Sequence, residues 1–119
     1  MNVAVIGASN KSNRYSHQAV VLLKEKGHTV FPVHPRIKNI NGLAVFPSIK
    51  DIDEDLHTVT MYVSPVVSNA MVQDILQKRP QRIIFNPGSE NVILEENARA
   101  LGIVTLNACT LILLKTMQF

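Results

Sequence analysis

A segment near the start of the chain combines residue types that bind phosphate groups. Gly7-Ala8-Ser9-Asn10-Lys11-Ser12-Asn13-Arg14 follows a short apolar run. Gly7 permits a tight turn and the close approach of a phosphate, and Ser9 offers a hydroxyl. Lys11 and Arg14 offer positive charge, and a helix starting after them would add free N–H groups at its N-terminus. The segment predicts phosphate binding, although it matches neither G-x-G-x-x-G nor a P-loop, and a plain turn with Ser16 as helix cap is the alternative.

A second basic segment narrows the class of ligand. Val33-His34-Pro35-Arg36-Ile37-Lys38 follows another apolar run. Enzymes that use NAD place Asp or Glu at this point to bind the ribose 2′-hydroxyl, and this chain has no acidic residue there. Arg36 and Lys38 instead favour a nucleotide with an extra ribose phosphate, which is NADP or coenzyme A. A solvated basic turn is the alternative.

Two further turns carry polar residues at the ends of apolar runs. Ser64-Pro65 has the order of a helix N-cap and first helical residue, and the Ser64 hydroxyl is expected beside a ligand cleft. In Asn86-Pro87-Gly88, proline stiffens the turn and Gly88 can adopt a positive φ or let a ligand come close. The Asn86 amide is expected to hydrogen-bond within the cleft.

Few residues of the chain are candidates for catalysis or metal binding. Glu90 fits a carboxylate at a helix N-terminus better than a general base. Cys109 fits a buried packing residue better than a thiolate nucleophile. The four histidines show no metal-ligand spacing. We therefore predict no catalytic residue and no metal ligand.

The candidate segments come together if the chain forms a parallel sheet. Short apolar runs alternate with helical patterns, which predicts an α/β protein with helices on both faces of the sheet. We expect a Rossmann-like, doubly wound, five-stranded parallel sheet with the strand order 3-2-1-4-5. Its strands are predicted at residues 2–6, 29–33, 58–63, 82–85 and 103–106. Residues 36–57 are expected to form a loop with one helical turn near 48–52.

Size and composition set further limits. The 119 residues suit one domain, so we expect a single nucleotide-binding domain over residues 1–119. A net charge of +3, no Trp, two Tyr and four Phe argue against a single-strand nucleic-acid binder. The single cysteine and the absence of a secretory signal or a ~20-residue apolar span predict a cytoplasmic protein without a membrane partner. A homo-oligomer remains open.

Several motifs in order resemble a known family. They are Val5-Ile6-Gly7-Ala8-Ser9, Pro32-Val33-His34-Pro35, Tyr62-Val63-Ser64-Pro65, Phe85-Asn86-Pro87-Gly88-Ser89-Glu90-Asn91, Gly102-Ile103 and Asn107-Ala108-Cys109-Thr110-Leu111. Together they resemble the small stand-alone CoA-binding domain proteins of bacteria. Those proteins are similar to the N-terminal nucleotide domain of the succinyl-CoA synthetase alpha subunit.

The resemblance implies a Rossmann-like fold that binds CoA or an acyl-CoA across the carboxyl ends of its strands. It places Gly7, Ala8 and Ser9 at the phosphate turn, Lys11 and Arg14 near phosphates, His34, Pro35 and Arg36 at the adenosine end, Ser64 and Pro65 against the ligand, and Asn86, Pro87 and Gly88 toward the pantetheine. The synthetase's catalytic histidine lies in a second domain, so the resemblance implies binding without ligase activity. An NADP-binding enzyme or redox sensor and an interaction subunit are the alternatives.

Overall fold

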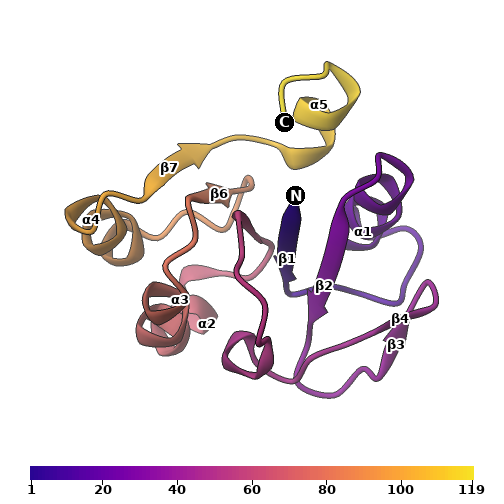
Figure 1. The fold of residues 1–119 in the computed structure, drawn as a ribbon, viewed down its shortest axis with the longest axis horizontal. Coiled ribbons are helices and arrows are strands. Elements are labelled where there is room, and N and C mark those ends of the chain that lie inside the picture. The colour runs from indigo at the N-terminus through magenta and orange to yellow at the C-terminus, as the bar shows by residue number, and fades with distance from the viewer.

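A computed structural model describes all residues from 1 to 119, and its centre is a five-stranded parallel sheet (Figure 1). The strands lie in the order β2-β1-β5-β6-β7, and every neighbouring pair is parallel. Their bounds are Asn2–Ile6 (β1), Thr29–Val33 (β2), Thr58–Met61 (β5), Arg82–Phe85 (β6) and Val104–Asn107 (β7). The predicted α/β class and five-stranded parallel sheet are confirmed, with two strands ending one or two residues from their predicted bounds.

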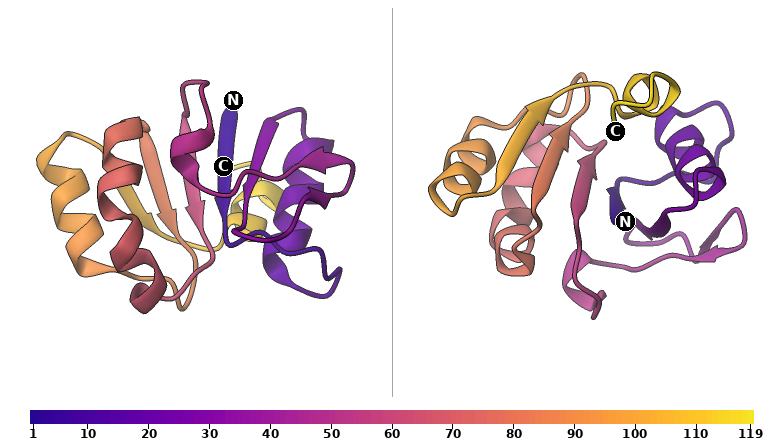
Figure 2. Two further views of the ribbon diagram at one scale, coloured as in Figure 1. Left: turned by 90° about the horizontal axis from the view of Figure 1, so that it is seen from below. Right: turned by 45° about the horizontal axis from the view of Figure 1, so that its top comes forward.

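Helices cover both faces of this sheet (Figure 2). One face packs against α1 and α5, and the other against η1, α3 and α4. Helix bounds are Tyr15–Glu25 (α1), Ile49–Asp51 (the 3₁₀ turn η1), Pro65–Ser68 (α2), Asn69–Met71 (the 3₁₀ turn η2), Val72–Lys78 (α3), Val92–Ala100 (α4) and Thr110–Lys115 (α5). The helical turn expected near residues 48–52 is present as η1. The helix expected to begin at Pro65 is present as α2, and η2 separates it from α3.

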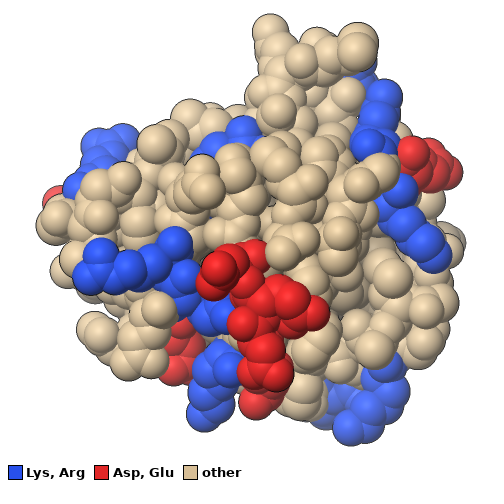
Figure 3. All heavy atoms as spheres, in the orientation of Figure 1, with Lys and Arg blue, Asp and Glu red and all other residues tan.

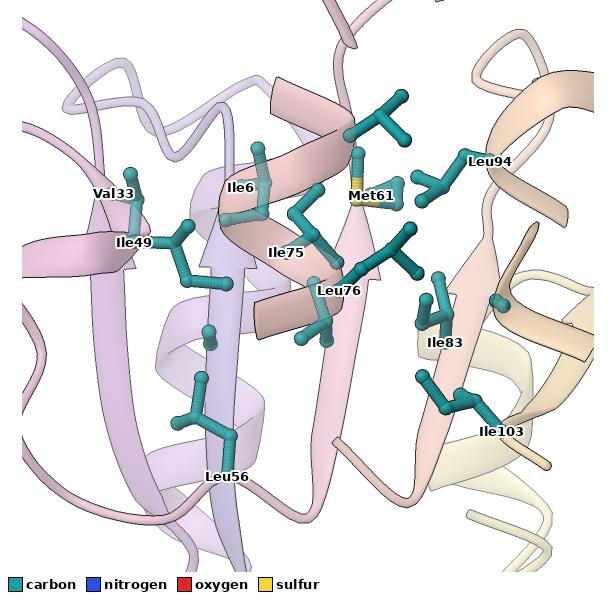
Figure 4. Close-up of a cluster of buried hydrophobic side chains, with 14 of the residues drawn as sticks. Ile6, Val33, Ile49, Leu56, Met61, Ile75, Leu76, Ile83, Leu94 and Ile103 are labelled. Carbon is teal, nitrogen blue, oxygen red and sulfur yellow. The ribbon is translucent and has the colours of Figure 1, made fainter. Parts of the chain in front are cut away.

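Side chains of the central strand β1 alternate between the two cores. Val3 and Val5 join the cluster under α1 and α5, whereas Ala4 and Ile6 join the larger cluster under η1, α3 and α4. Figure 4 shows part of the larger cluster, with Ile6, Val33 and Ile49 close together. A strand covered on both faces reads as a continuous apolar run, which is why residues 3–6 predicted a buried strand.

The predicted strand order is wrong in one respect. The strand of residues 58–61 lies between β1 and β6, whereas the prediction placed it outside β2, so the order of the five strands is 2-1-3-4-5. Pro32 gives the physical reason, because a proline within a strand cannot donate to a neighbour and is confined to sheet edges. At that edge Phe46 N donates to Pro32 O at 2.9 Å, so a loop residue covers the free side of β2.

The connection between β2 and β5 passes back over β1. It contains a hairpin of β3 (Asn39–Ile40) and β4 (Leu43–Ala44), followed by η1, whose Ile49 packs on the face opposite α1. The connection therefore crosses the sheet in the direction opposite to that of α1 and over the opposite face, as right-handed crossovers require. The winding changes direction between β1 and β5, and the ligand crevice of a doubly wound sheet is expected at this point.

The stripe of α4 that faces the core is narrow. Leu94 and Ala98 are buried, whereas Ile93 and Leu101 are 55% and 41% exposed. Because α4 has only nine residues, one pair at i and i+4 is enough to contact the sheet. On the exposed side of α4, Glu95 and Arg99 form an ion pair one turn apart, with 3.0 Å between Oε1 and Nη2.

The surface carries its charges in separate groups. Figure 3 shows Lys and Arg side chains spread over one face, with one group of acidic side chains below its middle and another acidic side chain at its right edge. This face therefore presents no continuous basic track of the kind that follows a nucleic-acid backbone. None of the helices combines the length and the apolar character that crossing a bilayer requires.

Candidate functional site

Two pockets meet above the carboxyl ends of β1, β2 and β5, at the point where the winding of the sheet reverses. One has a volume of about 370 Å³ and the other about 280 Å³. Gly7, His34 and Tyr62 line both, one from the end of each of these three strands. The two pockets therefore adjoin, and we call them together the switch-point crevice.

The smaller pocket is polar and follows the turn after β1. It is lined by Gly7, Ala8, Ser9, Asn10, Lys11, Arg14, Ser16, His34, Ile37 and Tyr62. Lys11 and Arg14 are exposed and have no carboxylate partner. The backbone N–H groups of Ser9 and Asn10 donate to no protein acceptor. Free N–H groups and unpaired cations make this pocket suitable for an anion such as a phosphate.

The turn around the polar pocket is held by its own hydrogen bonds. His17 Nδ1 donates to the carbonyl of Ser9 at 2.9 Å, and Lys11 N donates to Ser9 Oγ at 3.1 Å. Ser9 Oγ accepts in this contact, so its own proton is free to point toward a ligand. Helix α1 starts at Tyr15 after the extended residue Arg14, and Ser16, predicted as its cap, is buried in the first turn.

Gly7 sets the distance between the ends of β1 and β5. Its φ is +82°, and a Cβ built on it would lie 2.6 Å from Val63 Cγ1 and 3.1 Å from Tyr62 O. The N–H groups of Gly7 and Ala8 both donate to Val33 O, at 3.1 and 3.2 Å. The segment that follows β5 therefore lies close against the backbone of Gly7. No residue with a side chain fits this position without moving a wall of the crevice.

His34 presents a neutral ring where the two pockets meet. Its Nδ1 accepts hydrogen bonds from the backbone N–H groups of Arg36 and Ile37, both at 3.1 Å. The proton of the neutral ring therefore lies on Nε2. Burial, and then the charge of Arg36, hold the pKa of His34 below its ordinary value. His34 thus offers the Nε2–H as a hydrogen-bond donor at neutral pH.

Tyr62 forms a wall of both pockets. Its hydroxyl is buried and has no hydrogen-bond partner. Burial, followed by the nearby Cys109 thiol, raises the pKa of the Tyr62 phenol far above its ordinary value, and weaker effects of the Thr60 and Thr110 hydroxyls oppose the rise. Tyr62 therefore stays protonated and serves as an aromatic wall rather than as a base.

The larger pocket is mostly apolar and lies between η1 and the helices α2 and α3. Its walls are Ile6, Gly7, Val33, His34, Pro35, Pro47, Ser48, Ile49, Tyr62, Val63, Val67, Met71 and Asp74. Asp74 is the only carboxylate among them. An apolar pocket of this volume with a few polar groups is typical of a site for a flat organic group such as a nucleotide base.

The structure brings together about half of the predicted site residues. Gly7, Ala8, Ser9, Lys11, Arg14, His34 and Pro35 line the switch-point crevice. Arg36, Ser64, Pro65, Asn86, Pro87 and Gly88 line neither pocket. Ser64 is an exposed N-cap of α2 whose side chain makes no cap bond, and Gly88 N donates to the Glu90 carboxylate at 2.8 Å. Ligand contacts of this second group stay predictions.

Asn86 has a structural role in the fold. It is 2% exposed, and its Nδ2 donates to Thr60 Oγ1 at 2.7 Å and to Met61 O at 2.9 Å. Its Oδ1 accepts from Thr110 N at 2.8 Å. These bonds join β5, β6 and the start of α5, so the amide expected in the cleft is already occupied within the protein.

Sequence reasoning missed the residues that follow β5 and those of η1 and α3. Tyr62 and Val63 line the crevice because β5 lies beside β1, and Met71 and Asp74 follow from the same neighbour relation. Pro32 was the signal for this order, because it marks β2 as an edge strand.

The residues considered as a nucleophile or as metal ligands do not form a second site. Cys109 is half-buried at the N-cap of α5 and lines neither pocket. No cluster of three or more His, Cys, Asp or Glu side chains has a geometry that holds a metal ion.

Comparison with known proteins identifies relatives of this chain. The family described as "CoA binding domain" matches residues 1–115. The uncharacterized protein YneT of Bacillus subtilis is 30% identical over 60 residues, which are 50% of this chain and 44% of that protein. The ADP-forming acetate–CoA ligase of Methanocaldococcus jannaschii is 26% identical over 77 residues, 65% of this chain and 10% of the ligase. The chain thus matches less than half the length of either protein.

Solved structures share the whole fold. The crystal structure of an uncharacterized protein is 32% identical with a TM-score of 0.87, covering 99% of this chain and 97% of that one. A hypothetical protein from Pyrococcus horikoshii is 25% identical with a TM-score of 0.90 and coverages of 98% and 83%. An acetyl-coenzyme A synthetase of Ca. Korarchaeum cryptofilum, solved with phosphate and ADP, has a TM-score of 0.75 at 20% identity, covering 89% of this chain and 25% of the synthetase.

Proposed function

Because the chain belongs to the CoA-binding domain family, we propose that it binds coenzyme A or an acyl-CoA in the switch-point crevice without catalysis of its own. The observation that carries the proposal is the junction of a polar, cationic pocket with an apolar pocket. The charged pyrophosphate of a nucleotide matches the polar pocket, and its flat base matches the apolar pocket.

The two halves of the crevice suggest how the ligand lies. The pyrophosphate would lie in the polar pocket, against the free N–H groups of Ser9 and Asn10 and near Lys11 and Arg14. The adenosine would enter the apolar pocket beside Pro35. His34 Nε2–H stands between the two pockets, where it would donate to a phosphate or a ribose oxygen.

The turn after β2 supports CoA over NAD. Arg36 and Lys38 are exposed there, and the turn itself carries no carboxylate of the kind that accepts from the ribose 2′-hydroxyl in NAD enzymes. Cations at this turn gain from the 3′-phosphate of CoA and gain nothing from a bare hydroxyl. We therefore expect CoA to bind more tightly than dephospho-CoA and more tightly than NAD. NADP, whose phosphate is on the adjacent ribose oxygen, is the competing ligand.

The absence of catalysis is part of the proposal and has a geometric basis. Cys109 and Glu90, the groups considered as nucleophile and base, lie outside the crevice. His34, the titratable group at its centre, uses Nδ1 to accept from the backbone. We also propose that residues 1–119 form one CoA-binding domain, and that the protein is cytoplasmic because its single cysteine suits a reducing compartment.

Thermal unfolding with a panel of nucleotides tests this function. CoA, acetyl-CoA, dephospho-CoA, NAD and NADP are compared at one salt concentration, since screening weakens contacts to exposed cations. A ligand at about 100 times its Kd stabilises the folded state by about 2.7 kcal/mol. We expect CoA or acetyl-CoA to give the largest shift. A large shift with NADP and none with CoA would reassign the protein to the NADP-binding class.

A further inference from the structure

Asp74 is an unpaired carboxylate in the wall of an otherwise apolar pocket. It lies in the first turn of α3, is half-buried, and accepts no hydrogen bond from any protein group. The salt bridge of the structure joins two other residues, Glu95 and Arg99. The acceptor sites of this carboxylate are therefore available to a ligand that brings an N–H or O–H donor into the pocket.

The residue that would normally pair with Asp74 points elsewhere. Lys78 stands four positions later on α3, the spacing at which an acid and a base form a helix-surface pair. Its Nζ instead donates to the backbone carbonyls of Ile52 and Glu54, the latter at 3.0 Å, in the segment after η1. Lys78 thus ties α3 to the loop that covers the sheet, and the Asp74 carboxylate stays free.

The position of Asp74 indicates which part of a ligand it meets. It lines the apolar pocket and is absent from the polar pocket, where Lys11 and Arg14 lie. A carboxylate near the phosphates of a ligand would repel them. In the apolar pocket, away from Lys11 and Arg14, the Asp74 carboxylate would instead contact an uncharged part of the same ligand. A carboxylate has only acceptors to offer, so this part must carry an N–H or O–H donor.

We propose that Asp74 accepts a hydrogen bond from the exocyclic amine of the adenine base and so fixes the base in the apolar pocket. This assignment rests on the proposed function, which places the adenosine of CoA in that pocket. The amine is the donor that adenine presents at its edge. Asp74 is then a specificity-determining residue.

The test compares CoA with 1,N6-ethenocoenzyme A, whose exocyclic nitrogen belongs to a fused ring and carries no hydrogen. Affinities for both are measured by calorimetry with the wild-type protein, Asp74→Leu and Asp53→Leu. Leucine branches at the same carbon as aspartate and offers no acceptor, but it is bulkier. Asp74→Asn, which has the size of aspartate, is therefore measured beside it to control for the room left for the fused ring. Asp53 is an exposed acid outside both pockets and controls for the general effect of removing a negative charge.

We expect the wild type and Asp53→Leu to bind CoA about 10- to 100-fold more tightly than the etheno analogue, the range for a hydrogen bond to a charged group. In Asp74→Leu the ratio falls close to one, because CoA loses affinity and the analogue does not. Asp74→Asn, which keeps the shape and a weaker neutral acceptor, gives an intermediate ratio and replaces Asp74→Leu if that variant fails to fold.

A ratio near one in the wild type overturns the role of Asp74 and leaves CoA binding intact. A large ratio that persists in Asp74→Leu also overturns it, because the loss then comes from the shape of the fused ring. Failure of the wild type to bind CoA at all overturns the proposed function and this assignment with it.

Discussion

Replacing Gly7 by alanine tests whether the ends of β1 and β5 define the crevice. The φ of Gly7 is +82°, and the new Cβ would lie 2.6 Å from Val63 Cγ1 and 3.1 Å from the Tyr62 carbonyl oxygen. Val63 is β-branched and stiff, and the carbonyl belongs to the backbone, so neither yields easily. Alanine at this position combines backbone strain with a collision.

Gly27 provides a matched control. Its φ is +88°, nearly that of Gly7, and no atom lies within 4 Å of a Cβ built on it. Gly27→Ala therefore carries only the cost of a positive φ, about 1–2 kcal/mol. Gly7→Ala carries this cost together with overpacking, which adds about 1–3 kcal/mol.

Urea unfolding of the two variants measures the difference directly. We expect the free energy of unfolding of Gly7→Ala to be lower than that of Gly27→Ala by about 1–3 kcal/mol. Gly7→Ala should also lose affinity for CoA, since Tyr62 and Val63 must move, whereas Gly27→Ala should keep it. Equal unfolding free energies for the two variants would refute the close approach at Gly7.

Other perturbations give separate outcomes. Asn86→Ala removes a buried amide with three hydrogen bonds and is expected to destabilise the fold by about 2–4 kcal/mol in urea unfolding, and a loss below 1 kcal/mol would contradict its structural role. Arg14→Ala should weaken CoA binding about tenfold in calorimetry through loss of a charged contact, while Arg79→Ala, an exposed arginine outside the crevice, leaves it unchanged. Burial is the main cause that holds the pKa values of His28 and His57 below their ordinary value. The unfolded chain then binds more protons, so stability is present above about pH 6.5 and lost as the pH falls through the lower folded values. The melting temperature should drop between pH 7.5 and 5.5, and a flat profile would argue against neutral histidines in the fold.

The sequence predicts elements well where local chemistry decides them. The apolar runs at residues 2–6, 29–33 and 82–85 are strands with these bounds, and Gly27 follows α1 with a positive φ. These features depend on residues close together in the chain, namely buried runs and a glycine after a helix.

The order of the strands depends on contacts between distant segments, and there the prediction failed. Alternation of strands and helices is the same for the orders 3-2-1-4-5 and 2-1-3-4-5, and both obey right-handed crossovers. Only Pro32 separates them, because it requires an edge position for β2. Asn41-Gly42 likewise favours the hairpin of β3 and β4, which lies within the residues predicted to form a loop.

The part of the candidate site that lies on the turns after β1 and β2 could be predicted from the sequence. The turn after β1 and His34-Pro35 stand at strand ends in either strand order, so these residues line the crevice as expected. Tyr62 and Asp74 enter only because β5 and α3 lie beside β1 and η1, which local patterns do not reveal. A polar residue at a strand end such as Asn86 can serve equally to join strands, which the sequence pattern does not distinguish from ligand binding.

Amide NMR spectra of the labelled protein titrated with CoA test the central claim most directly, because they report both whether CoA binds and where. We predict saturable shifts that are largest in residues 7–14, in His34 and in residues 62–63, all around the switch-point crevice. An unchanged spectrum at millimolar CoA, or shifts confined to the opposite end of the sheet around His28 and Phe119, would contradict the account.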